Sequence, residues 1–426
     1  MKLELRKIFK ISFICILVLS PLITQNITAI QHSSQNTNCQ YISSDILFDF
    51  KVKTLMRVTN HDALSVCIIK DNQTVWAKSY GYSHPHLFRK ATNRTIYGVG
   101  SITKTITATA ILQLYEKGLL DLDDDINTYL PFEIRNPNFP DVPITIRSLL
   151  IHRSSNQDYY VMTSEGRDTL LKLYLKNFFS CENSLPDSSL NWIKEALIPG
   201  GKFYKDECWF DFPPNNKTAY STMGFIIATA ILENITNQTI EEYCQKHIFM
   251  PLEMKDTSFH PSNLDKERIA RPFLGTRFLK IPLLHYDIGC ISGGGGIRTT
   301  LEDISHFLIA NLNNGQYKDV RILNESTMKM MHNTIYPDDL YPKYHPYIHG
   351  FAWFSTEEYG ERLLGHGGGA VGYDCMIAMN KTTNTGIIFL STKLVSRMFY
   401  KLNYVLAHDS RIILMRLLLE KEKELS

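Results

Sequence analysis

The chain has 426 residues, of which 44% are hydrophobic and 21% are charged, a composition that excludes a disordered or collagen-like protein. Its 45 basic and 43 acidic residues leave a formal charge of +2, which is too small to favour nucleic acid or an anionic membrane as a partner. Any partner has to be inferred from a specific site.

The N-terminus combines four basic residues within the first ten with an apolar run at 11–23. This combination is typical of a secretory signal peptide, which we place at residues 1–30. The run is shorter than the roughly 20 residues that span a bilayer. We expect a secreted, extracellular protein, and the alternative is a signal-anchored membrane protein that keeps the segment.

Eight Asn-x-Ser/Thr sequons agree with a secreted glycoprotein. They lie at Asn26, Asn72, Asn93, Asn216, Asn234, Asn237, Asn324 and Asn380. Eight cysteines are present, and without Cys15 in the signal seven remain, so one stays unpaired within the chain. Their spacing matches no zinc site. Cys181 and Cys208 flank a polar insertion and are the favoured disulfide, whereas Cys67 and Cys290 are expected to be buried thiols.

The first predicted elements are a helix and a β-hairpin. Apolar residues recur at helical spacing over 46–58. Two β-rich runs follow at 63–69 and 74–81, separated by the polar turn 70–73, and this pattern predicts two paired strands.

A helical region is predicted next. Its first helix covers 103–118 and ends at Gly118, and residues 121–130 form a turn into a short helix. The acidic run in that turn lacks the twelve-residue pattern of a calcium loop, so we interpret it as a solvated turn. Further helices are expected at 146–151, 168–179, 221–234 and 240–249.

The C-terminal part returns to strands. The glycine run 293–296 lacks the Lys and Ser/Thr of a phosphate-binding loop and is expected to be a close-packed turn. A helix at 301–311, strands at 347–354, 372–378 and 386–390, and a last helix at 397–419 follow, with a solvated charged tail at 416–426. No linker or repeat intervenes, so one domain at 45–415 is expected, an α+β fold whose N- and C-terminal strands share an antiparallel sheet around an inserted helical lobe.

A Ser-x-x-Lys pattern marks the start of the helix at 103–118. Ser101 follows Gly98 and Gly100, and Lys104 lies one helical turn after it, so both side chains face the same side. A desolvated lysine can lose its proton and act as a base toward a serine hydroxyl. The helix N-terminus favours the negative charge that develops during such a reaction.

The pattern alone is weak, because Ser326 and Lys329 repeat it. That copy lacks the preceding glycines and the downstream partners, so we interpret Ser326 as a helix N-cap.

Two downstream motifs complete the constellation. Tyr220 and Thr222 open another helix, and His366, Gly368 and the neighbouring glycines precede a strand. In this order and spacing the chain resembles the serine β-lactamase and penicillin-binding-protein superfamily, in particular its class C-like hydrolases and the mitochondrial β-lactamase-like proteins of animals. The resemblance covers roughly residues 45–415 and implies a β-lactamase/transpeptidase-like fold.

The resemblance also implies roles for these residues. Ser101 would attack a carbonyl group to form an acyl-enzyme, with Lys104 and Tyr220 sharing base and acid duties. The amides of Ser101 and Gly369 would form the oxyanion hole. Gly367 and Gly368 would allow close approach of the substrate.

Thr222 and His366 are the remaining expected substrate-binding residues. His366 stands where many relatives carry Lys, and it would bind a substrate carboxylate or tune Tyr220. Thr222 replaces the usual Asn of the second motif. After His152, the residues Arg153, Ser154 and Ser155 replace the Thr-Ser-Gly that is more usual in the family. For His152 itself we expect a structural hydrogen bond.

The sequence thus predicts a serine hydrolase of amide or ester bonds, acting as a peptidase, esterase or weak β-lactamase on a small-molecule or peptide substrate. No cofactor and no metal are expected. The competing hypothesis is a non-catalytic binding or filament-forming relative with the same fold. Retention of Ser101, Lys104 and Tyr220 together argues against it. The natural substrate and the oligomeric state stay open.

Overall fold

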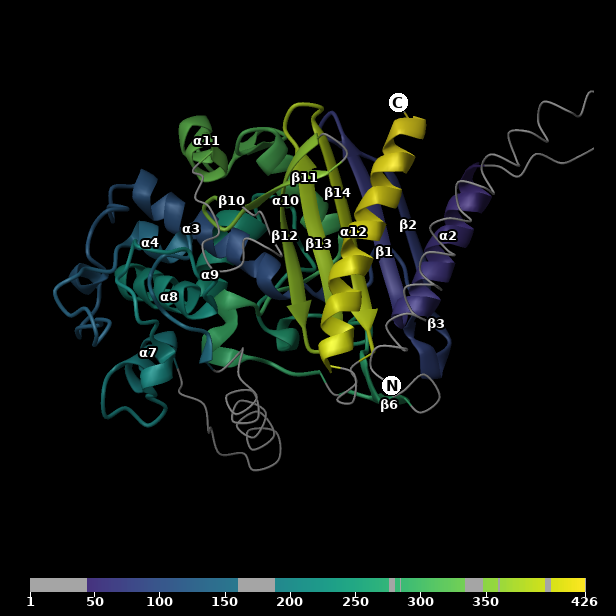
Figure 1. Ribbon diagram of the computed structural model, residues 1–426. Coiled ribbons are helices and arrows are strands. Elements are labelled where there is room, and N and C mark those ends of the chain that lie inside the picture. The colour runs from purple at the N-terminus through teal and green to yellow at the C-terminus, as the bar shows by residue number, and fades with distance from the viewer. Residues whose placement is uncertain are drawn as a thin grey trace, which may run out of the picture. The chain divides into compact units, whose positions relative to one another are not determined.

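The computed structural model describes residues 44–159, 188–275, 280–283, 285–333, 348–358, 361–394 and 400–425 (Figure 1). The chain divides into two compact units, residues 1–51 and 52–426. The predicted signal at 1–30 and the predicted helix at 168–179 lie outside the described residues. No helix in the described part of the chain is long and apolar enough to cross a membrane.

An eight-stranded antiparallel sheet forms the core of the 52–426 unit, in the order β10-β11-β12-β13-β14-β1-β2-β3. Its strands are β1 His61–Lys70, β2 Gln73–His84, β3 Arg89–Lys90, β10 Ile348–His349, β11 Phe354–Glu358, β12 Glu361–Ala370, β13 Tyr373–Asn380 and β14 Thr385–Lys393. β14 pairs with β1 along its length. This pairing confirms that the N- and C-terminal strands share one sheet.

The β1–β2 hairpin forms at the predicted turn. Lys70 pairs with Gln73, which leaves a two-residue connection. Asp71 and Asn72 there have φ values of 49° and 63°. Both residue types tolerate this left-handed backbone, which matches the twist of the flanking strands.

Helices cover both faces of the sheet. On β14, the Thr385 hydroxyl contacts Glu422 of α12 (Tyr400–Leu425) at 3.5 Å. A methyl group at the next residue, Gly386, would lie 3.1 Å from Leu308 of α10 (Leu301–Leu312). Successive strand residues point to opposite faces, so α12 and α10 pack on opposite sides (Figure 1).

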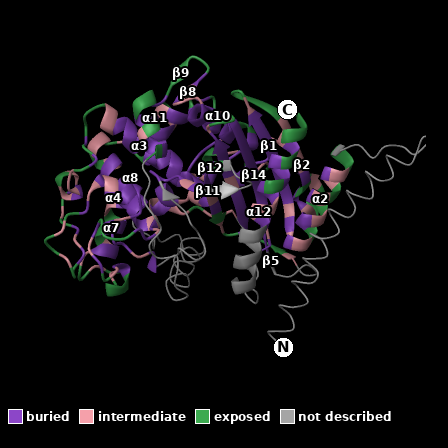
Figure 2. Cartoon of the chain, turned by 45° about the horizontal axis from the view of Figure 1, so that its top comes forward, coloured by how far each residue is buried: buried purple, intermediate pink, exposed green. Residues whose placement is uncertain are grey.

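The helical lobe is organised around α8. Its helices are α3 Thr103–Glu116, α4 Ile146–Leu150, α7 Ser189–Leu197, α8 Thr222–Thr236 and α9 Ile240–Cys244. α8 packs against α3, α4 and α7 and is buried from Met223 to Leu232 (Figure 2). α3 ends as predicted, because Gly118 adopts a φ of 65°. Together with α2 (Ser44–Thr59), these helices confirm the expected α+β fold with an inserted helical lobe.

Three elements differ from the expectation. β12 includes the glycine motif at 366–369, which was predicted to precede a strand at 372 rather than to lie within one. The predicted strand at 347–354 is interrupted by a bend where Ala352 has a φ of 60° and its N–H donates to the Leu150 carbonyl oxygen. α12 continues past the predicted end at 419, because Leu418 and Lys421 are buried on it. The segment predicted as a solvated tail at 416–426 is therefore helical through Leu425.

Cys208 is a free cysteine packed in the hydrophobic core. Cys181, its predicted disulfide partner, lies outside the described residues. Burial raises the pKa of Cys208 to about 11, which leaves the thiol protonated at neutral pH. Cys67 is buried as predicted, whereas Cys290, also expected to be buried, is only partly buried.

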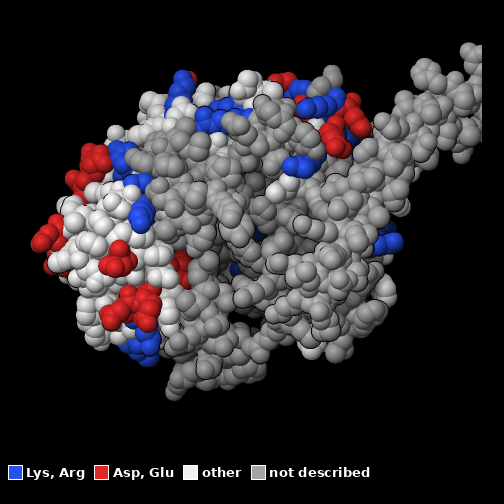
Figure 3. Space-filling view, viewed as in Figure 1, with Lys and Arg blue, Asp and Glu red and all other residues white. Residues whose placement is uncertain are grey.

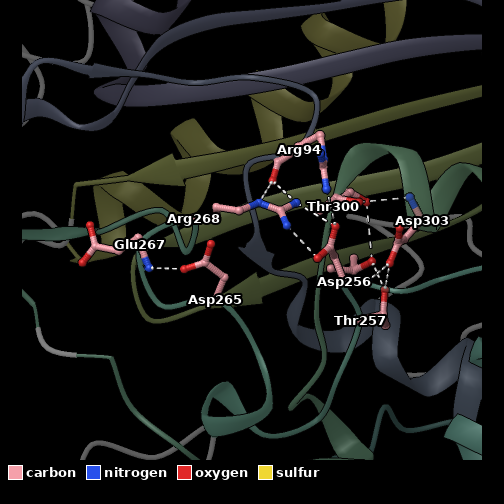
Figure 4. A network of polar contacts seen from close by, with 9 residues as sticks. Arg94, Asp256, Thr257, Asp265, Glu267, Arg268, Thr300 and Asp303 are labelled. Atoms are coloured by element: carbon pink, nitrogen blue, oxygen red, sulfur yellow. Dashed lines mark hydrogen bonds and ion pairs between the residues drawn. The ribbon is translucent and has the colours of Figure 1, made fainter.

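A polar network fixes the segment that leads to Ser101 (Figure 4). Arg268 donates two hydrogen bonds of 2.7 Å to the Asp256 carboxylate and a further one to the Arg94 carbonyl oxygen. Asp303 on α10 accepts from the Asp256 N–H and the Thr257 hydroxyl, both at 2.7 Å. The network thereby joins four separate chain segments, and the segment of Arg94 leads directly into the strand before Ser101.

Candidate active site

Ser101 lies in a short 3-10 turn, Gly100–Ile102, directly before α3. The turn follows β4 (Tyr97–Gly98), which pairs with β7 (Arg298–Thr299). Gly100 has a φ of 51°, and a methyl group there would lie 2.6 Å from the Gly369 carbonyl oxygen. Only glycine meets both requirements, and its presence brings Ser101 next to the backbone of β12.

Lys104 is fully buried beside Ser101. Its Nζ lies 3.2 Å from Ser101 Oγ and donates a 2.6 Å hydrogen bond to the Gly294 carbonyl oxygen. Burial lowers the pKa of Lys104 to about 8, and the negative charge of Asp158 partly opposes this effect. A large fraction of Lys104 is therefore neutral near pH 8 and able to accept a proton.

The glycine run at 293–296 forms the close-packed turn that the sequence predicts. A methyl group at Gly293 would lie 1.8 Å from Thr229 Oγ1, and one at Gly294 would lie 2.5 Å from Thr222 Cγ2. The turn therefore sits directly on α8, and it carries the carbonyl oxygen that holds Lys104.

Tyr220 faces the same lysine from the segment before α8. Its ring centroid is 5.1 Å from Lys104 Nζ, and the Phe225 ring centroid is 5.8 Å from the same nitrogen. The ring packs against the His152 ring, with 4.5 Å between centroids. Ser101, Lys104 and Tyr220, which lie up to 119 residues apart in the chain, thus meet at one place.

The first turn of α8 is held by residues outside the helix. The Ser221 N–H donates to Nδ1 of His152 at 3.1 Å, which confirms the structural hydrogen bond expected for that histidine. The Thr222 and Met223 N–H groups donate to the Asp158 carboxylate at 2.6 and 3.0 Å. All of these donors would otherwise be unsatisfied at a helix start.

Thr222 lies at the first position of α8 and is half-buried. Its methyl group points at Gly294, whose carbonyl oxygen accepts the Lys104 hydrogen bond. The residue therefore borders the site, and it contributes a smaller polar group than the Asn of the family pattern would.

His366 is on β12 and is almost fully buried, with an exposed fraction of 1%. Its Nδ1 lies 2.7 Å from the Gly367 carbonyl oxygen, so that nitrogen carries the proton and donates. The ring lies 4.6 Å from the Phe354 ring and 6.3 Å from the Tyr220 ring, measured between centroids. This position suits the expected tuning of Tyr220 better than a direct contact with a substrate carboxylate.

The glycines of β12 are required by their neighbours. A methyl group at Gly368 would lie 1.8 Å from the Val99 carbonyl oxygen. One at Gly367, on the opposite face, would lie 2.4 Å from the Arg411 guanidinium of α12. Gly369 is exposed and abuts Gly100. This close packing explains why a glycine-rich segment forms a strand here.

The second Ser-x-x-Lys pattern lies elsewhere. Ser326 is exposed and lies inside the first turn of α11 (Glu325–Asn333), not at the N-cap as predicted, because the helix already begins at Glu325. Lys329 forms an ion pair of 2.7 Å with Glu325. Its charge is thus balanced at the surface, and no base is placed beside Ser326.

Asp158 and Phe354 belong to the site and were not predicted, whereas the glycine run that contains Gly294 was expected beside it. Asp158 meets residues 64 positions later in the chain, and no spacing rule in the sequence indicates such a contact. The glycine run was recognised as close-packed, but which carbonyl oxygen accepts from Lys104 depends on the tertiary fold. Within the described residues, no group of three His, Cys, Asp or Glu side chains could hold a metal ion.

The geometry therefore provides a hydroxyl, a buried amine of lowered pKa and a phenol at one place. This set can remove a proton from the hydroxyl, carry it to a leaving group and return it, which is the requirement of nucleophilic acyl transfer.

Comparison with known proteins identifies relatives of this chain. A family model described as Beta-lactamase matches residues 48–410. The chain is 26% identical over 368 residues to Protein flp of Staphylococcus aureus (strain MW2), covering 84% of this chain and 66% of that protein. It is 26% identical over 305 residues to a putative D-alanyl-D-alanine carboxypeptidase of Escherichia coli (strain K12), covering 63% of this chain and 64% of that protein.

A solved structure shares the fold over most of the chain. The octameric penicillin-binding protein homologue from Pyrococcus abyssi superposes with a TM-score of 0.68 at 25% identity, covering 82% of this chain and 74% of that one. The fold, the order of the motifs and the match over 48–410 lead to one conclusion: the chain belongs to the β-lactamase family.

Proposed function

We propose that the protein is a serine hydrolase that opens amide or ester bonds through an acyl-enzyme on Ser101. The observation that carries this proposal is the buried Lys104, whose Nζ lies 3.2 Å from Ser101 Oγ and whose pKa is lowered to about 8. A surface lysine would be protonated at neutral pH and could not act as a base.

The reaction would proceed in two stages. Neutral Lys104 takes the proton of Ser101 Oγ as the oxygen attacks the substrate carbonyl carbon, and the amides of Ser101 and Gly369 stabilise the oxyanion, each donor contributing about 3 kcal/mol. Tyr220 passes the proton to the leaving nitrogen or oxygen as its bond to carbon breaks. Water then attacks the acyl ester, which releases the acid and restores Ser101.

The substrate class follows less directly from the relatives. The chain spans 66% of the length of Protein flp. The putative carboxypeptidase among the relatives supports amide bonds as substrates. We propose small peptides, amides or esters, handled by a protein that enters the secretory pathway through its N-terminal segment.

A non-catalytic binding protein is the rival function. It would not require a buried amine next to a hydroxyl, and burial of a charged group costs free energy that pairing and hydrogen bonds have to offset. The site geometry therefore favours the enzyme.

Activity-based labelling tests the proposal. The full-length protein is treated with a fluorescent penicillin and, separately, with a fluorophosphonate, and the modified residue is mapped by peptide mass spectrometry. We expect modification at Ser101 by at least the fluorophosphonate. Absence of labelling by both probes in the folded protein would favour the binding function.

A further inference from the structure

A buried carboxylate lies directly behind the candidate site. Asp158, on the loop after α4, has an exposed fraction of 4%. Burial of an ionised carboxylate is costly unless hydrogen bonds satisfy its oxygens. The hydrogen-bond partners of Asp158 therefore indicate its structural role.

Those partners are consecutive groups at the start of α8. The Thr222 N–H lies 2.6 Å from both carboxylate oxygens, and the Met223 N–H lies 3.0 Å from Oδ1. The Ser221 hydroxyl donates to the same oxygen at 3.3 Å. The carboxylate thus fixes the helix start through three donors and lies where the helix dipole favours a negative charge.

This anchor decides where Tyr220 lies. Tyr220 immediately precedes Ser221, so its backbone continues directly from the anchored turn. From the same loop as Asp158, His152 accepts the Ser221 N–H and packs its ring on the Tyr220 ring. The loop after α4 therefore fixes the backbone next to Tyr220 and also packs on the Tyr220 ring.

Asp158 also acts on Lys104 through its charge. The Tyr220 ring lies over Lys104 Nζ, and His152 on the loop after α4 and His366 on β12 lie beside that ring. Asp158 is the carboxylate whose charge acts on Lys104. Burial lowers the pKa of Lys104, and the charge of Asp158 raises it, so that the result lies at about 8.

We propose that Asp158 is a positioning residue of the site, which holds Tyr220 through the first turn of α8 and places its negative charge at that turn, where it acts on Lys104. The inference rests on the proposed function, because it assigns this residue to the same acyl-transfer site. Asp158 touches neither the substrate nor Ser101 in this account.

The kinetic test compares a variant that removes the negative charge of Asp158 with a variant that keeps the charge but moves the carboxylate oxygens. In Asp158→Asn, the amide nitrogen cannot accept the α8 N–H groups, so we expect fluorophosphonate acylation to slow by on the order of 10- to 100-fold. The acid limb of its pH profile should move to lower pH, because Lys104 loses its proton more readily without the carboxylate. Asp158→Glu keeps the charge but displaces the oxygens, so it should lose rate with an unchanged acid limb.

A helix-cap variant away from the site provides the control. Thr239 caps α9 through its hydroxyl and Glu242. Thr239→Val should lower Tm without changing the acylation rate or the acid limb. Wild-type rate and acid limb in Asp158→Asn would overturn the proposal; if that variant does not fold, a wild-type rate in Asp158→Glu would do so.

A titration that needs no catalysis separates this inference from the proposed function. NMR of protein labelled with [ε-¹³C]lysine, in a Ser101→Ala background and with Lys104→Arg for assignment, follows the protonation of Lys104 directly. Asp158→Asn should lower its midpoint, and an unchanged midpoint would overturn the proposal. If the wild type is never acylated at Ser101, the proposed function fails, and this titration still decides the role of Asp158.

Discussion

Lys104 loses the hydration that a surface lysine keeps, and this lowers its pKa. Because the pKa differs between the folded and the unfolded chain, the protonation of Lys104 is coupled to folding. Its folded pKa of about 8 lies below the value of about 10.4 for an unfolded chain. The unfolded chain therefore binds more protons between these two values, and the free energy of unfolding rises as the pH increases through that window. Below about pH 8 the penalty for the charged form is fully present.

The same shift predicts the pH dependence of activity. Only neutral Lys104 accepts the Ser101 proton, so kcat/KM for a p-nitrophenyl ester should rise with pH along a limb centred near 8. Lys104→Arg, whose guanidinium stays protonated, should lose at least about 10²-fold in kcat/KM. Lys329→Arg in the second Ser-x-x-Lys pattern serves as the control and should match the wild type. A pH-independent rate between pH 6 and 9 would exclude Lys104 as the base.

Thr222 determines which acyl compounds the site should accept. Threonine offers one short hydroxyl where asparagine offers an amide, so a bicyclic lactam should be poorly oriented for acylation, whereas an unconstrained ester should suffer less. We expect weak turnover of nitrocefin relative to a p-nitrophenyl ester, and Thr222→Asn should raise the nitrocefin rate relative to the ester. The measurement is kcat/KM for both compounds on both proteins. Rapid nitrocefin turnover by the wild type that falls in Thr222→Asn would refute this explanation.

At the scale of elements, hydrophobic periodicity and turn residues predicted the helices and hairpins that depend on interactions between residues close in sequence. The periodicity of 103–118 with its terminal Gly118 predicted α3, and two β-rich runs around a polar turn predicted the β1–β2 hairpin. β12 could not be predicted in this way, because glycine disfavours a strand and only Val99 and Arg411 on its two faces make glycine necessary. For the site, the motif residues were predictable, but Asp158 was not, since its contacts depend on tertiary structure.

The packing of β12 leads to a prediction about glycine. Because a methyl group at Gly368 would lie 1.8 Å from the Val99 carbonyl oxygen, Gly368→Ala should push β12 away from the Ser101 turn. We expect a loss of roughly 10²-fold in kcat/KM, since a displacement of about 1 Å at a reacting centre has that effect.

Gly118→Ala is the matched control for this variant. Gly118 has a positive φ, unlike Gly368, but no atom lies within 4 Å of the added methyl group. It should cost about 1 kcal/mol of stability and leave activity intact. Equal activity of Gly368→Ala and Gly118→Ala would show that the close contact of β12 with the turn is not needed for activity.

At the scale of the molecule, the surface agrees with the small net charge. Acidic and basic side chains lie interspersed over the described part of the face shown in Figure 3, without a region of one sign. The described part of this face therefore offers no field of one sign that would steer a highly charged partner.

The structure also ranks the sequons for the secretory hypothesis. Asn72, at the tip of the β1–β2 hairpin, is exposed, whereas Asn380 has an exposed fraction of 4% and its side-chain oxygen accepts from the Thr382 and Thr383 N–H groups. Protein secreted from eukaryotic cells should carry a glycan at Asn72 and none at Asn380. Asn72→Gln should increase gel mobility, while Asn380→Gln should not change it. An unglycosylated, cytosolic product would contradict the secretory hypothesis.

The central claim is that Ser101 carries the acyl group, and trapping that intermediate tests it most directly. The protein is mixed with a p-nitrophenyl ester, quenched in acid within the first turnover, and mapped by peptide mass spectrometry, alongside Ser101→Ala and Ser326→Ala. We expect the acyl group on Ser101 in the wild type and in Ser326→Ala, and neither adduct nor turnover in Ser101→Ala. Turnover by Ser101→Ala at the wild-type rate, or an acyl group on another residue, would contradict the account.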